Sequence, residues 1–395
     1  MSVITFSSDG DAMSVDRPDL LATLGDLVRI NSVNPVLVPG APGEREIAGY
    51  VARRLGEAGL EVTPHEPEPG RVSVTGRLPG TGGGRSLMLN AHMDTVGVNE
   101  MTDPFGAAVR DGRLYGRGAY DMKGSLAACL AAARSLARSG APLRGDLIIA
   151  AVADEEYGSL GTASVLGALR TDAAIVTEPT SLRICRAHKG YVWIEVLVLG
   201  RAAHGSRFDQ GVDANLRMGR FLGLLAGLER ELRSRPPHPL VGPPSLHAAL
   251  LEGGSGLSTY AGRSAVKIER RTVPGETEAG AVAEIAALLG PLLADGTGCG
   301  AMASAFFSRE PFEVTEEAGI VRALDRAATN VLGRAPVHFG DTPWMDSALT
   351  AGAGIETVVF GPHGAGAHAA EEWVDVESVV QTAEVLVETA RAWCA

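Results

Sequence analysis

Residues 86–94 read SLMLNAHMD, and this stretch decides the fold. Its first six residues form a mainly apolar run, which is typical of a buried β-strand. His92 and Asp94 follow the predicted strand directly. Because ligands of open α/β sheets bind beyond the carboxyl ends of the strands, these two side chains mark the first candidate functional position.

Three further apolar runs indicate that this strand belongs to an α/β sheet. They are LIIAAVA (147–153), AAIVT (173–177) and TVVF (357–360). Helices are expected at residues 19–30, which place leucines on one face, and at the alanine-rich residues 122–139. The alternation of strands and helices predicts an α/β domain with a mostly parallel sheet.

The sequence between these parts has a different pattern. YVWIEVLVLG (191–200) and SAVKIERRTV (264–273) alternate apolar and polar side chains, as half-exposed antiparallel strands do. We therefore predict that residues 189–309 form a separate α+β domain of ferredoxin-like type. This domain would be inserted into the α/β domain, which residues 1–188 and 310–395 would form.

Imidazole and carboxylate side chains also follow the other predicted strands. They are Glu155 and Glu156 after the second run, Glu178 after the third, and His368 in the glycine-rich loop after the fourth. Asp121 opens the alanine-rich helix, where a carboxylate meets the positive end of the helix dipole. We expect these side chains to converge with His92 on one edge of the sheet.

Two histidines and three carboxylates form a ligand set that suits a pair of zinc, cobalt or manganese ions. In two-metal hydrolases the ions stand about 3.5–4 Å apart, lower the pKa of a shared water and polarise the scissile carbonyl. The adjacent Glu155 and Glu156 supply one more carboxylate than ligation requires, so one of them is available as a base. Asp94 is placed to orient the imidazole of His92.

The composition excludes several other classes of protein. A formal charge of −12 and a pI near 5.3 argue against a nucleic-acid partner. The N-terminal stretch has neither the basic nor the apolar region of a signal peptide, and no run is long enough to span a membrane, so a soluble cytoplasmic protein is expected. The four cysteines form no CxxC pair. No G-x-S-x-G elbow occurs, which argues against a serine hydrolase.

Taken together, the motifs resemble the M20-type metallopeptidase family, which contains acetylornithine deacetylase, succinyl-diaminopimelate desuccinylase and glutamate carboxypeptidase. The matching stretches are LVRINSVNP, NAHMDTV, LYGRGAYDMKG, ADEEYG, VTEPT, HKGYVWIEV, GRAAHGS, IERRTVPGE and FGPHGAGAHAAEEWV. They cover nearly the whole chain in the order of the family. The resemblance implies a homodimer whose inserted domain is the dimerisation domain. It also implies hydrolysis of the amide bond of an N-acyl amino acid by an enzyme with two divalent ions per chain. Zinc is the expected metal, and cobalt and manganese are the alternatives.

The resemblance also implies a role for each matching residue. His92 and Glu178 belong to one metal ion, Glu156 and His368 to the other, and Asp121 bridges both. Glu155 matches the general base, and Asp94 matches the carboxylate that supports the first histidine. The peptide bond between Asp121 and Met122 matches a cis bond of the family.

Two residues of the inserted domain match substrate-binding positions of the family. His204 corresponds to the histidine that helps to hold the substrate carbonyl, although it could also cap a loop. Arg271 corresponds to the arginine that binds the substrate carboxylate. Its neighbour Arg270 would point to the other face of the strand, so only one of the two can face the site.

Departures from the family pattern affect the identity of the substrate rather than the metal chemistry. Residues 256–263 read GLSTYAGR, where several members carry Asn, and Glu269 stands where Asp is common. One alternative is therefore an amino- or carboxypeptidase of the same family that acts on small peptides. The other alternative is a catalytically silent relative that binds an amino acid or a partner.

Overall fold

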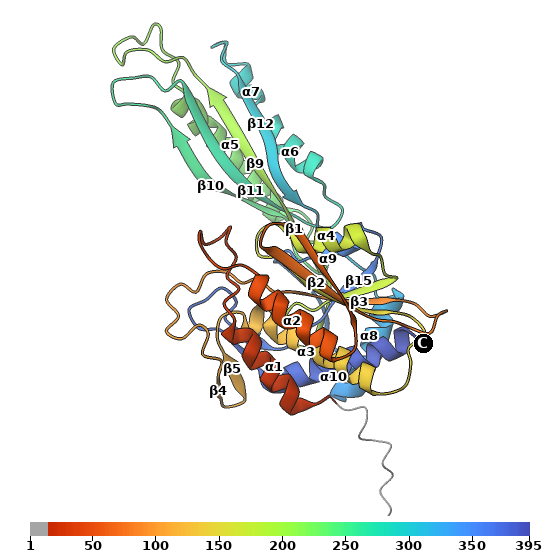
Figure 1. Ribbon diagram of the computed structural model, residues 1–395. Coiled ribbons are helices and arrows are strands. Elements are labelled where there is room, and N and C mark those ends of the chain that lie inside the picture. The colour runs from red at the N-terminus through yellow and green to blue at the C-terminus, as the bar shows by residue number, and fades with distance from the viewer. Residues whose placement is uncertain (1–14) are drawn as a thin grey trace, which may run out of the picture. The chain divides into compact units, whose positions relative to one another are not determined.

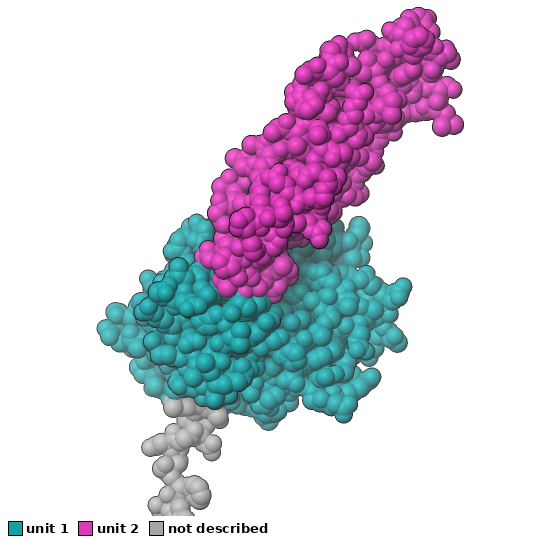
Figure 2. Space-filling view, turned by 180° about the vertical axis from the view of Figure 1, so that it is seen from behind, with its two compact units in different colours: residues 1–186, 314–339, 345–395 teal, residues 187–313, 340–344 magenta. Residues whose placement is uncertain are grey.

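The computed structural model describes residues 15–395 of the chain. Residues 1–14, which hold most of the N-terminal stretch discussed above, lie outside the described residues. The chain divides into two compact units (Figure 2). Unit 1 contains the described residues up to 186 together with residues 314–339 and 345–395, and unit 2 contains residues 187–313 and 340–344.

Unit 1 is built on a nine-stranded sheet (Figure 1). Its strands, in spatial order, are β1 (Glu61–Glu68), β2 (Arg71–Leu78), β6 (Leu147–Val152), β3 (Leu87–His92), β7 (Ala173–Val176), β15 (Glu356–Val359), β8 (Ile184–His188) and β13 (Phe312–Glu313), with β14 (His338–Asp341) paired to β8. The four central strands β6, β3, β7 and β15 are parallel, whereas β1, β2, β8 and β13 pair antiparallel. The α/β class is thus confirmed, and the sheet is a mixed one with a parallel centre.

The alternation of side chains along β3 explains why helices cover both faces of the sheet. Leu87, Leu89 and Ala91 pack into one hydrophobic cluster, while Met88 packs into another. The first cluster includes residues of α1 (Arg17–Arg29), α2 (Arg45–Glu57), α3 (Gly124–Arg138), α8 (Gly319–Leu332) and α10 (Val376–Trp393). The second includes residues of α4 (Leu160–Ala168) and α9 (Ser347–Gly352). Both faces of the central strands are therefore buried, as the near-continuous apolar runs require.

A small second sheet holds the base of the glycine-rich loop. Its strands, in spatial order, are β16 (Gly364–Ala365), β17 (Trp373–Asp375), β5 (Arg113–Tyr115) and β4 (Ala108–Arg110). Because β16 and β17 pair antiparallel, the residues between them form a loop that is closed at its base. Gly366 lies in this loop with φ +88°, and a Cβ there would come within 1.9 Å of the Glu371 carbonyl oxygen. Only glycine allows the loop to fold so closely.

Unit 2 contains a four-stranded antiparallel sheet. Its strands, in spatial order, are β10 (Ser245–Gly253), β11 (Arg263–Thr272), β9 (Gly190–Leu199) and β12 (Ala301–Arg309). Alternate residues of β9, such as Val192 and Ile194, pack with residues of α5 (Ala214–Ser234) and α6 (Glu278–Ala287). The short helix α7 (Gly290–Leu293) follows α6. One face of the sheet is therefore covered by helices, and the intervening side chains lie on the other face.

No helix among residues 15–395 is both long and apolar enough to cross a membrane.

Candidate metal centre

Three parallel strands of unit 1 deliver candidate ligands at their carboxyl ends. His92 is the last residue of β3, and Glu178 follows β7 by two residues. Glu155 and Glu156 lie in the turn after β6. Because neighbouring parallel strands end at the same edge of a sheet, their side chains are brought together there.

Asp121 lies at the centre of the cluster. It lies in the kinked segment η2 (Ala119–Lys123) that precedes α3, where Asp121 and Met122 have non-helical backbone angles. The peptide bond between these two residues is cis, as the resemblance implied. The expected helix therefore begins at Gly124 rather than at residue 122. The Oδ1 atom of Asp121 lies 3.1 Å from His92 Nε2, and its Oδ2 atom lies 3.4 Å from His368 Nε2. The two carboxylate oxygens thus face two different imidazoles.

The cluster divides into two groups that share the edge of the sheet. In the first, the His92 group, ligand atoms of His92, Glu155 and Glu178 all lie within 4.8 Å of one another. In the second, the His368 group, His368 Nε2 lies 3.0 Å from Glu156 Oε2 and also faces Asp121. Ligand atoms of Asp121 and Glu156 also lie within 4.8 Å of one of His92, so His92 borders both groups. The His92 side chain is 1% exposed and that of His368 is 56% exposed.

Burial and mutual charge shift the pKa values of these groups. Burial raises the pKa of Glu155 well above its ordinary value, and the carboxylate of Glu178 raises it further. Burial likewise raises the pKa of Glu178 well above its ordinary value, with further contributions from the carboxylates of Asp121, Asp346 and Glu156. Burial alone would lower the pKa of His92, but Glu178, Asp121 and Glu155 together raise it well above its usual range. Hydrogen bonds to Asp121 and Glu156 raise the pKa of His368 to about 10. In the metal-free chain, these side chains therefore tend to hold protons, which bound cations would have to displace.

The donor set fits a pair of divalent cations. In the described part of the chain, no Lys or Arg forms an ion pair with Asp121, Glu155, Glu156 or Glu178. Buried carboxylates are costly unless they are paired or coordinate a metal. A mixture of imidazole nitrogen and carboxylate oxygen suits zinc and other borderline divalent ions. His92, Asp121, Glu156, Glu178 and His368 could therefore hold two such ions.

Asp94 supports the cluster through its backbone and its side chain. The Nδ1 atom of His92 lies 2.9 Å from the Asp94 carbonyl oxygen and 3.7 Å from its carboxylate. The carboxylate instead accepts hydrogen bonds from the backbone N–H groups of Glu155 and Glu156, at 3.0 and 3.2 Å. Asp94 thus fixes the tautomer of His92 with its carbonyl group and the turn after β6 with its carboxylate.

Further polar residues behind Asp94 were not predicted from the sequence. Asn34 Nδ2 donates to Asp94 at 2.8 Å and to Asp154 at 2.9 Å. Arg71 donates to Asp154 at 2.7 Å and to both carboxylate oxygens of Glu44. Asp154 is therefore buried and hydrogen-bonded to the residues that support the cluster. Asn34 could have been found from the sequence, because it lies in the quoted motif LVRINSVNP. Arg71 and Glu44 lie outside the quoted motifs, so no motif indicated their role.

His204 and Arg271 lie in unit 2, whereas the cluster described above lies in unit 1. His204 is exposed, and its Nδ1 contacts Ser206 Oγ at 2.8 Å. Arg271 donates through Nε to Glu269 at 2.7 Å, and the other oxygen of Glu269 accepts from Trp193 Nε1 at 3.0 Å. Arg270 is buried in ion pairs with carboxylates of α6 and its preceding turn. Between the two arginines, Arg271 is thus the one whose side chain is accessible.

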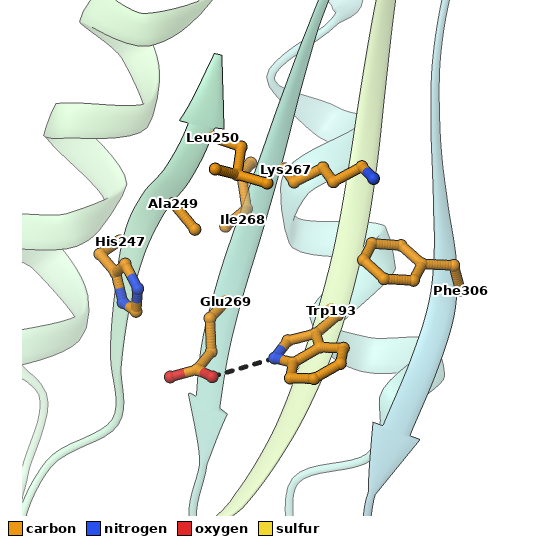
Figure 3. A pocket seen from close by; sticks show the side chains of 8 residues that line it. All are labelled: Trp193, His247, Ala249, Leu250, Lys267, Ile268, Glu269 and Phe306. Carbon is orange, nitrogen blue, oxygen red and sulfur yellow. Dashed lines mark hydrogen bonds between the residues drawn. The ribbon is translucent and has the colours of Figure 1, made fainter. Parts of the chain in front are cut away.

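The face of the unit 2 sheet that carries Trp193 also holds a shallow cavity of about 340 Å³ (Figure 3). Its lining includes Trp193, Phe306 and the aliphatic part of Lys267, with Glu269 and His247 at one end. The cavity is mainly apolar and lies within unit 2.

An α/β sheet with imidazoles and carboxylates gathered at its strand ends offers the ligands that a hydrolase with two divalent ions requires. Residues 88–392 match the peptidase family M20/M25/M40. The chain belongs to this family and is therefore an enzyme that acts on amide bonds.

Curated and solved relatives support the assignment to the family. An acetylornithine deacetylase of Myxococcus xanthus is 32% identical over 97% of this chain and 99% of its own length. The aminopeptidase PepT of Bacillus cereus has the same fold, with a TM-score of 0.79 and 20% identity over 96% of this chain and 100% of that chain. A dinuclear metal-binding peptidase of the same family from Bacillus subtilis superimposes with a TM-score of 0.73, at 18% identity over 95% of this chain and 98% of its own.

Proposed function

We propose that the protein is a deacylase of N-acyl amino acids, of the deacetylase or desuccinylase type. The observation that carries this proposal is the similarity to an acetylornithine deacetylase over 97% of the chain, combined with the cluster of ligands in unit 1. The solved peptidases share the fold at lower sequence identity, so a peptide substrate remains the competing outcome of the test below.

Two divalent ions held by His92, Asp121, Glu156, Glu178 and His368, most suitably zinc, would supply Lewis-acid chemistry to the attacking water and to the scissile carbonyl. Glu155 is the proposed general base. Its carboxylate takes a proton from the attacking water and passes it to the nitrogen of the leaving amine. Burial and the neighbouring Glu178 raise the pKa of Glu155 in the metal-free chain, and bound cations would lower it again toward the range in which a carboxylate accepts a proton.

Asp94 keeps Glu155 in position for both proton transfers. The hydrogen bond from the Glu155 backbone N–H to Asp94 Oδ1 fixes the turn that carries the base. The same carboxylate also fixes the next residue, Glu156, which is a proposed ligand. One side chain therefore sets the spacing between base and ligand.

Arg271 is the proposed anchor for the α-carboxylate of the substrate. Its Nε is held by Glu269, and the guanidinium lies 5.1 Å from the centre of the Tyr191 ring. The two Nη groups make no hydrogen bond within residues 15–395, which leaves a planar pair of donors for a carboxylate. We expect Arg271→Lys to raise KM more than it lowers kcat, because a point charge replaces a bidentate contact.

His204 is the proposed donor to the oxyanion that forms at the substrate carbonyl. Its Nδ1 is engaged by Ser206, so the other ring nitrogen is left to face a ligand. We propose in addition that unit 2 dimerises and that His204 serves the site of the partner chain. The edge strand β10 carries Leu250 and Leu251, which are 65% and 60% exposed, and an exposed apolar edge strand favours pairing with another chain.

A substrate panel tests the proposed activity. The metal-loaded protein is assayed with N-acetyl and N-succinyl amino acids, dipeptides and tripeptides, and Glu155→Gln serves as the control for contaminating hydrolases. We expect kcat/KM to be highest for an N-acyl amino acid. A clear preference for peptides would make the protein a peptidase, and no turnover of any amide would make it a silent relative.

Complementation between two inactive variants tests the shared site. Glu155→Ala and His204→Ala are each expected to be nearly inactive alone. Co-expressed chains that pair at random should form mixed dimers in which one of the two sites regains both residues, so about a quarter of all sites in the preparation would be intact. Mixed dimers without regained activity would show that His204 acts in its own subunit or has no role.

A further inference from the structure

Arg117 and Glu372 form a buried ion pair that connects the segments carrying the candidate ligands Asp121 and His368. Neither residue of the pair is itself a candidate ligand. Glu372 has a fully buried carboxylate, and Arg117 donates to its Oε2 through Nη1 at 2.6 Å. The guanidinium of Arg117 is 1% exposed. Burying a pair of charges is costly, so the contacts that this pair makes need an explanation.

The carboxylate of Glu372 holds the backbone that carries Asp121. Its Oε1 accepts from the N–H groups of Tyr120 and Asp121, each at 3.0 Å, and its Oε2 accepts from that of Gly118 at 3.0 Å. Together with Arg117, four donors use the carboxylate fully. Glu372 is therefore occupied by the protein itself and is not a further metal ligand.

The guanidinium of Arg117 reaches the loop that carries His368. Its Nη2 donates to the carbonyl oxygen of Ala369 at 2.8 Å, and its Nε donates to that of Gly97 at 3.1 Å. Ala369 is the residue after His368. A single planar group thus joins the Asp121 turn, through Glu372, to the His368 loop.

We propose that Arg117 and Glu372 are a positioning pair that sets the distance between Asp121 and His368 and thereby the affinity of the second metal position. This inference rests on the proposed two-ion centre. The pair acts mainly on the His368 group, because it holds both Asp121 and the loop of His368, whereas of the His92 side it reaches only the shared Asp121. The other histidine, His92, is fixed independently by the end of β3 and by the Asp94 carbonyl oxygen.

The test is a zinc titration of Glu372→Gln by calorimetry, with bound metal counted after gel filtration. The amide has nearly the shape of the carboxylate, but its NH2 group must face two donors whichever way it is turned. We expect the second ion to bind about 10–100-fold more weakly and the first to be weakened less, because Asp121 faces both imidazoles whereas only the His368 loop also depends on Arg117. Arg117→Lys keeps the charge but loses the planar fork, so it carries the same prediction if Glu372→Gln does not fold.

Arg217→Lys is the matched control. Arg217 is also a buried arginine, which pairs with Asp295 at 2.8 Å and donates to the carbonyl oxygens of Leu292 and Cys299, but it lies in unit 2. This control should lower the melting temperature and leave both zinc affinities unchanged. Two wild-type affinities in Glu372→Gln and in Arg117→Lys would overturn the positioning role. A wild-type chain that takes up no zinc would instead overturn the metal centre itself.

Discussion

His92 and His368 face the two oxygens of the same carboxylate, but the protein holds the two imidazoles in different ways. His92 ends a central strand, is 1% exposed, and is fixed by the carbonyl group of Asp94. His368 lies on a loop, has a φ of +63°, and is 56% exposed. A buried strand positions its own ligand, whereas a ligand on a loop depends on contacts made by other residues. The pair formed by Arg117 and Glu372 supplies such contacts.

The largest expected effect separates the two neighbouring glutamates, of which Glu155 lies in the His92 group and Glu156 in the His368 group. Glu155→Gln should keep its bound metal and lose about 10²–10⁴-fold in kcat, because it removes the proton shuttle but no ligand. Glu156→Gln should lose metal from the His368 group. Metal analysis and kinetics on the same preparations check both results. If Glu155→Gln contains no metal while Glu156→Gln keeps its metal, the two roles are reversed.

The second effect concerns protons that the metal must displace. In the metal-free chain Asp121 and Glu156 raise the pKa of His368 to about 10, so its ring is protonated at neutral pH and the proton competes with the ion. Zinc affinity should therefore rise with pH below that value, by about tenfold per pH unit for each proton released. Calorimetry in two buffers of different protonation enthalpy counts these protons. His368→Ala should release fewer protons, and His65→Ala, which changes a histidine outside the cluster, should release as many as the wild type.

The smallest expected effect is on the free energy of unfolding of the metal-free protein, compared between variants of the two histidines. His92→Ala leaves buried carboxylates without a partner and should lower the free energy of unfolding by on the order of 1–3 kcal/mol. His368→Ala removes a 56% exposed imidazole from the largely buried carboxylates of Asp121 and Glu156 and should lower it by less, about 1 kcal/mol, because solvent reaches the imidazole. Urea unfolding in the presence of a chelator measures both. Equal losses would mean that the two imidazoles are held alike, against the comparison above.

The central strands and the residues that follow them could be predicted from the sequence. Runs such as residues 86–91 are apolar throughout because both faces of the parallel strands are covered. His92, Glu178 and the two glutamates after β6 stand out because charged or polar side chains follow these runs at once. The antiparallel edge strands were missed, since β1 carries the sequence EVTPHEPE, which is polar and contains two prolines.

The supporting residues could not be predicted from the pattern alone. Arg117, Glu372 and Arg71 are buried, although a charged residue is most often on the surface. Arg117 and Glu372 lie in quoted motifs, but neither motif indicates that the two side chains pair. Their partners are far away in the sequence, as Arg117 and Glu372 are 255 positions apart. Only the fold brings such pairs together, so local periodicity carries no signal for them.

The measurement that tests the central claim most directly is a count of bound metal joined to an assay. The purified protein is stripped with a chelator, reloaded with zinc or cobalt, and assayed on an N-acetyl amino acid at each step. The five converging ligands predict about two ions per chain, loss of activity on chelation and its return on reloading. A chain that binds no ion and hydrolyses the amide in the presence of the chelator would contradict the account.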